Sequence, residues 1–169
     1  MAQETGMKPI PALAALARAA GLEGVPVGPG DLAPLGGQGG AYLLAMALGK
    51  GTTIAFRGGP LMLAPGLYLY AGSARGPGGI RARLARHFRR DKKPHWHVDA
   101  LTVLADAMAA LAIPGGSECA IVAALAAAPD GADGRAVTFP QDGFGSSDCP
   151  ACRAHLMRWN GAAPARLPA

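Results

Sequence analysis

Residues 66–88, GLYLYAGSARGPGGIRARLARHF, change from an apolar run to a basic helical pattern without a long linker. The tyrosine- and leucine-rich run at 66–73 is typical of a strand, because turn-forming residues bound it on both sides. Ile80, Leu84 and Phe88 then recur every four residues, which gives a helix one narrow apolar stripe. A strand that leads so directly into a helix predicts a sheet with helices packed against it.

The remaining pattern predicts further strands and helices on both sides of this unit. The run at 52–56 is expected to return as the hairpin partner of 40–48, and the apolar residues at 61–63 extend it. The stretch at 21–40 is crowded with glycine and proline, which indicates a loop or a flexible linker. Strands are predicted at 40–48, 52–56, 66–73 and 107–113, with a short one near 136–139, and helices at 9–20, 80–88, 96–104 and 117–128. The sum is an α/β fold with a small mixed, largely antiparallel sheet flanked by helices.

The 169 residues are enough for one domain with a hydrophobic core. We expect residues 1–38 to form an N-terminal extension, made of a short helix and a Gly/Pro-rich linker. Residues 39–160 form the domain, and residues 161–169 form a tail.

The net charge of +5 and the pI near 9.5 make nucleic acid the first partner to consider. Between Arg75 and Lys93, every charged side chain except Asp91 is basic, so much of the excess lies in one segment. The alternative is that this segment is simply the solvated face of a helix.

Three cysteines, an odd number in a chain of this size, argue against a disulfide framework and favour a reducing compartment. The N-terminus has no convincing signal peptide, and Asp106 interrupts the apolar stretch at 100–113. We therefore expect a cytoplasmic protein that does not enter a membrane.

GAY at 40–42 and YAG at 70–72 precede a basic helix with Arg83, and Glu118 lies on a later helix. This order of motifs resembles that of the GIY-YIG nuclease superfamily. PHWHVDAL, SEC and the later GFGSSDC segment are similar to the compact, single-domain branch described as Uri-type or DUF123 endonucleases. The resemblance covers roughly residues 38–160 and implies a GIY-YIG-like fold.

The resemblance implies a metal-dependent endonuclease that hydrolyses phosphodiester bonds in DNA. Tyr42 and Tyr70 match the motif tyrosines, which activate or position water, and Arg83 matches an arginine that stabilises the transition state. Glu118 matches the glutamate that binds one divalent ion, Mg²⁺ or Mn²⁺. His87 stands where many relatives have another tyrosine. The gap between Tyr42 and Tyr70 is longer than in typical members, so the intervening hairpin must be enlarged without separating the two phenols.

The chemistry of these residues is consistent with that assignment, although each has a simpler structural explanation. A tyrosine base must overcome a pKa of about 10, and Arg83 is the cation expected to lower it. Helical phase places Arg83 and His87 at the edge of the buried stripe. The alternatives are half-buried strand tyrosines, a boundary histidine with one backbone hydrogen bond, and a Glu118 that only favours the helix dipole.

A second group of basic residues is expected to contact nucleic-acid phosphates. It comprises Arg75, Arg86, Arg90, Lys92, Lys93, His95 and His97. For the HWHVD segment at 95–99, a capped helix start is a slightly better interpretation than a rim of the site.

Cys149, Cys152 and His155, with Cys119 as a conceivable fourth ligand, can form a zinc site. A single Cys-x-x-Cys pair is a weak signal, and buried cysteines often act as small hydrophobic residues, so we favour packing over structural zinc. Two rival functions remain: a catalytically inactive nucleic-acid-binding module on the same scaffold, and a zinc-stabilised protein-interaction module.

Overall fold

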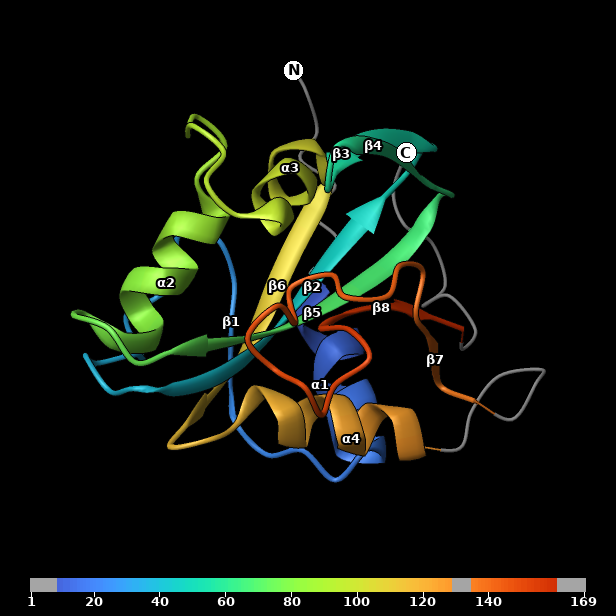
Figure 1. The fold of residues 1–169 in the computed structure, drawn as a ribbon. Helices are drawn as coiled ribbons and strands as arrows, with labels where there is room; N and C mark the ends of the chain where they lie inside the picture. Colours follow the sequence, from blue (N-terminus) through green and yellow to red (C-terminus); the bar gives the residue numbers. More distant parts are fainter. Residues whose placement is uncertain (1–8, 129–134, 161–169) are drawn as a thin grey trace, which may run out of the picture.

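The computed structural model describes residues 9–128 and 135–160 and confirms the predicted fold class (Figure 1). All neighbouring strands are antiparallel in its six-stranded sheet, whose order is β1-β6-β2-β5-β8-β7, and a separate two-stranded sheet joins β3 and β4. The strands are β1 (Val25–Val27), β2 (Gly40–Leu48), β3 (Thr52–Phe56), β4 (Gly59–Leu63), β5 (Gly66–Ala74), β6 (Ala107–Pro114), β7 (Val137–Thr138) and β8 (Leu156–Trp159). The helices are α1 (Pro9–Ala19), α2 (Gly79–Phe88), α3 (His97–Leu104) and α4 (Glu118–Ala127). Among the described residues, none of the helices has the length and hydrophobicity that a bilayer span requires.

Strand β2 lies at the centre of the fold and is buried along its whole length. Because side chains alternate along a strand, its residues feed two separate hydrophobic clusters. Leu44 and Met46 belong to the cluster that includes α2 and α3, whereas Leu43 and Ala45 belong to the cluster that includes α1 and α4. The sheet is therefore the middle of three layers, with α2 and α3 on one face and α1 and α4 on the other (Figure 1).

The predicted pairing of 52–56 with 40–48 is wrong. Strand β2 is already paired on both sides, with β5 and β6, so β3 has no free edge of β2 to join. Strand β3 instead forms a hairpin with β4, and this hairpin packs on the α3 side of the sheet. The long insertion between the two motif tyrosines is thus accommodated outside the main sheet, and β2 and β5 remain direct neighbours.

The predicted loop at 21–40 also contains a short strand that the sequence did not indicate. Val25 pairs with Ala112 and Val27 with Ala110, which places β1 at the edge of the main sheet. Proline is tolerated in an edge strand, and here Pro26 hides the strand in a Gly/Pro-rich sequence. The expected N-terminal segment thus contributes both α1 and β1, while its first eight residues and the expected tail at 161–169 lie outside the described residues.

A buried carboxylate holds α2 and α3 together. Asp99 accepts hydrogen bonds from the backbone N–H groups of His95 and Trp96 and from the Arg86 guanidinium, at 2.7, 3.0 and 2.8 Å. Burial alone would raise the pKa of Asp99, but these donors outweigh it and hold the pKa below its usual value. The interpretation of 95–99 as a capped helix start is therefore confirmed.

We expect Asp99→Asn to lower the free energy of unfolding by about 3 kcal/mol, because it leaves the half-buried Arg86 charge and the buried Lys92 charge without their counter-ion. Urea unfolding at neutral pH measures this loss. The matched control is Asp91→Asn. Asp91 is 94% exposed, and its ion pair with Arg89, at 3.9 Å, lies in solvent. Equal stability of the two variants would contradict the role given to Asp99.

Candidate active site

All five predicted catalytic residues line one cavity of about 330 Å³. They come from four elements: Tyr42 from β2, Tyr70 from β5, Arg83 and His87 from α2, and Glu118 from the start of α4. The cavity is completed by Gly72, Ser73, Trp96, Val98, Gly145, Asp148, Cys149 and His155.

The pairing of β2 with β5 brings the two tyrosines close together. Tyr42 lies opposite Gly72, and Tyr70 lies opposite Leu44, two residues further along the ladder. A side chain at Gly72 would overlap the Tyr42 phenol, so this glycine creates the space that Tyr42 occupies. Gly145 does the same for Tyr70, because a Cβ atom there would lie 2.7 Å from the ring. Strand β5 continues through Gly72 to Ala74, slightly beyond the predicted strand at 66–73.

Tyr68, the third tyrosine, lies outside the cavity. It is buried, and its hydroxyl donates to the carbonyl of Ala64 at 2.7 Å. Tyr68 is therefore a packing residue of the core.

Tyr42 and His87 form a buried pair, with the phenol oxygen 2.7 Å from the imidazole Nε2. Burial, followed by the positive charge of Lys92, lowers the pKa of His87 to about 3. His87 is therefore neutral at physiological pH and is a poor proton acceptor. It orients the Tyr42 hydroxyl instead.

Burial also determines the protonation state of the two tyrosines in the cavity. It raises the pKa of Tyr42 far above its usual value and that of Tyr70 to about 12, although Arg83 acts on both in the opposite direction. Arg83 thus lowers both pKa values, as expected, but burial outweighs its effect. Both side chains are neutral phenols at physiological pH.

Trp96 positions the arginine of the site. The Arg83 guanidinium lies 4.4 Å from the centre of the Trp96 ring, and the Arg86 guanidinium lies 4.8 Å from it. Such contacts hold a cation by the negative face of the ring. In the described part of the chain no carboxylate forms an ion pair with Arg83, so its charge is directed to the cavity. The sequence analysis missed Trp96, and the only available signal was an aromatic residue inside a basic, histidine-rich segment.

Glu118 begins α4 at the end of the sheet where β6 ends. Strand β6 finishes at Pro114, which pairs with Gly40, so α4 starts near the Tyr42 end of β2. The Oε2 atom of Glu118 is buried and has no hydrogen-bond partner among the described residues. A buried carboxylate oxygen is costly without a partner, so this atom is suited to a bound cation.

The predicted phosphate-binding residues fall into two groups. The first group is exposed and has no hydrogen bond from its side chain within the described residues, as a phosphate contact requires: Arg75, Lys93, His95 and His97. The other three are engaged within the protein: Arg86 pairs with Asp99, Arg90 donates to the Ala105 carbonyl, and the buried Lys92 ammonium donates to the carbonyls of Arg86 and His87. For Lys92 the prediction is wrong, because its side chain is fully buried as a cap of α2.

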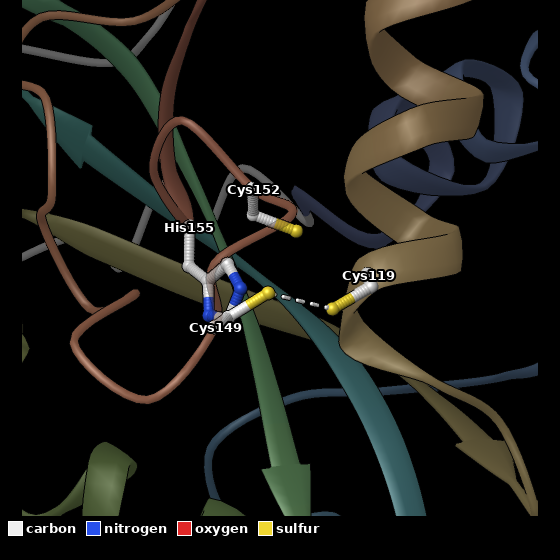
Figure 2. A group of neighbouring side chains, drawn as sticks. All are labelled: Cys119, Cys149, Cys152 and His155. Carbon is white, nitrogen blue, oxygen red and sulfur yellow. Dashed lines mark hydrogen bonds between the residues drawn. The ribbon is translucent and has the colours of Figure 1, made fainter.

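The three cysteines and His155 lie together beside the cavity (Figure 2). Their four ligand atoms are within 4.8 Å of one another. The sequence analysis named these residues but favoured simple packing for them.

The family model described as "Domain of unknown function DUF123" matches residues 41–167 of the chain. No curated protein and no solved structure matches the chain.

We expect Gly72→Ala to destabilise the protein by about 2 kcal/mol, because the added methyl group overlaps the Tyr42 phenol. Thermal and urea unfolding measure the change. Gly76→Ala is the matched control, since a Cβ atom at Gly76 would meet nothing within 4 Å. If Gly72→Ala is as stable as Gly76→Ala, the Tyr42 ring does not lie over Gly72.

We expect no tyrosine of the folded, chelator-treated protein to ionise at its usual pKa of about 10, because burial raises all three. The unfolded chain ionises first, so stability is fully present below pH ~10 and is lost as the pH rises toward the folded pKa values. Absorbance titration of wild type, Tyr42→Phe and Tyr70→Phe measures this. If one tyrosine ionises below its usual pKa, and this transition is missing from the titration of Tyr42→Phe or Tyr70→Phe, the replaced tyrosine is an activated phenolate and the expectation is wrong.

Proposed function

The chain belongs to the family described as "Domain of unknown function DUF123", and we propose that it is a metal-dependent endonuclease that hydrolyses phosphodiester bonds in DNA. The observation that carries the proposal is the convergence of Tyr42, Tyr70, Arg83 and Glu118 on one cavity from four separate elements. The same four residues carry the resemblance to GIY-YIG nucleases. The pairing of β2 with β5 keeps the two tyrosines together despite the inserted hairpin.

The donor set fits a hard divalent cation such as Mg²⁺ or Mn²⁺. The unpartnered Oε2 atom of Glu118 supplies one carboxylate, and the exposed Asp148 lines the same cavity. Mg²⁺ commonly binds through one or two carboxylates and takes its remaining ligands from water and substrate phosphate. When bound, the ion would neutralise phosphoryl oxygens and lower the pKa of a coordinated water.

Arg83 would bind the phosphoryl oxygens on which charge develops in the transition state. Stacking on Trp96 restricts the guanidinium before substrate arrives, and a preorganised donor needs little rearrangement during the reaction. The guanidinium also lacks an ion-pair partner among the described residues, so substrate binding need not break an existing pair.

The tyrosines would act as neutral hydrogen-bonding groups. With its pKa raised by burial, the Tyr42 hydroxyl is suited to orienting the attacking water rather than to removing its proton. His87 fixes the Tyr42 oxygen and stays neutral, so it is a positioning residue. Tyr70 would orient the phosphate or the water from the neighbouring strand.

The basic residues around Trp96 would contact the rest of the nucleic acid. Two further hollows share Trp96 with the cavity, and their lining includes Arg83, Arg86, Lys93 and His95. Phosphate contacts by such side chains are independent of base sequence. The proposed substrate contact is therefore with the backbone.

We expect Glu118→Gln to reduce Mg²⁺-dependent DNA cleavage by about 100-fold or more, because the amide removes the charge that holds the ion. Arg83→Ala should reduce cleavage by a similar factor, because it removes the cation that would stabilise the transition state. The assay uses labelled branched, nicked and single-stranded DNA.

The matched controls are Glu23→Gln and Arg81→Ala, which change the same residue types at exposed positions. Both should cleave like the wild type. Cleavage that survives unchanged in Glu118→Gln and Arg83→Ala would refute the site, and DNA binding without cleavage in any protein would favour the inactive binding module.

A further inference from the structure

We propose that Cys119, Cys149, Cys152 and His155 bind one Zn²⁺ ion in a closed structural site. The four residues come from separate parts of the chain and are brought together by folding (Figure 2). Cys119 is in the first turn of α4, Cys149 and Cys152 belong to the loop after Phe144, and His155 directly precedes β8.

The ligand atoms have nearly the spacing that zinc requires. All four lie within 4.8 Å of one another, and the sulfurs of Cys119 and Cys149 are 3.2 Å apart. Around a tetrahedral zinc with Zn–S bonds of about 2.3 Å, two sulfurs are about 3.8 Å apart. An ion at the centre would therefore need the Cys119 and Cys149 sulfurs to move slightly apart and the more widely spaced ligand atoms to move slightly inward.

His155 provides an independent indication of a ligand. Its side chain is buried, and its Nε2 atom has no hydrogen-bond partner among the described residues. A buried polar atom without a partner is costly, so this nitrogen is suited to binding a metal ion.

The donor types select zinc over the ion proposed for Glu118. Thiolates are soft ligands that favour zinc, whereas Mg²⁺ takes oxygen ligands. Four protein ligands leave no open position, which distinguishes a structural zinc from a catalytic one. A disulfide between Cys119 and Cys149 would leave Cys152 and the unpartnered His155 nitrogen unexplained.

The zinc would fasten the start of α4 to the loop that closes the cavity. Glu118 is the residue before Cys119, and Cys149 and His155 line the cavity themselves. Any effect on catalysis rests on the proposed function, whereas zinc binding does not.

The test is metal analysis of untagged protein purified in the presence of a reductant. We expect one zinc per chain, loss of thermal stability when a chelator removes it, and recovery when zinc is restored. Cys152→Ser and His155→Gln should weaken zinc binding by more than about 100-fold, since losing even an outer-shell partner commonly costs 10–100-fold. His95→Gln, at an exposed histidine, is the matched control and should retain the ion.

If the variants do not fold, Co²⁺ titration of the metal-free wild type still tests the site, because tetrahedral thiolate coordination gives a characteristic visible spectrum. Stoichiometric appearance of that spectrum, and its loss on adding zinc, would support the proposal. Absence of zinc and of the cobalt spectrum, or full zinc binding by a folded Cys152→Ser variant, would overturn it. These measurements do not use DNA, so they stand apart from any result for cleavage.

Discussion

The site depends on the register of β2 against β5. In this register the Tyr42 ring lies over Gly72, and Tyr70 follows on the same face. Side chains alternate along a strand, so a slip of one residue would move Tyr42 to the face covered by α1 and α4. The burial of β2 on both faces opposes such a slip, because it would exchange Leu44 and Met46 for smaller alanines in the cluster with α2 and α3. The register that packs the core is therefore the same register that places the phenols.

Burial also determines which groups in the cavity are charged. The phenols and His87 are neutral because they are removed from water and are not compensated by a strong ion pair. Arg83 and Glu118 are different, since one is held by an aromatic ring and the other begins a helix, where a negative charge is favoured. The cavity thus combines neutral hydrogen-bonding groups with the Arg83 guanidinium and the carboxylates of Glu118 and Asp148, and this combination suits phosphate together with a metal ion.

The sequence predicted the elements more accurately than their partners. The spacing of Ile80, Leu84 and Phe88 and the apolar runs at 40–48 and 66–73 record local periodicity, so α2, β2 and β5 were identified. Pairing is set by non-local competition for strand edges, which is why the partner of β3 was assigned wrongly. The capping position of Lys92 and the stacking of Trp96 on Arg83 depend on how α2 and α3 pack, and no local pattern encodes that. The tyrosine pKa shifts were missed for a related reason, since the extent of burial is a property of the whole fold.

The first turn of α4 connects the two proposed metal chemistries. Successive helical residues point about 100° apart, so Glu118 and Cys119 face different surroundings although they are adjacent in sequence. Glu118 presents an oxygen to the cavity, and Cys119 presents a sulfur to the cluster in Figure 2. Hard cations select the oxygen and soft cations the sulfur, so the two sites can be occupied by different ions without exchange. A zinc that fixes this turn would also fix the Glu118 backbone, and the loop after Phe144 would then carry one wall of the cavity as well as three of the zinc ligands.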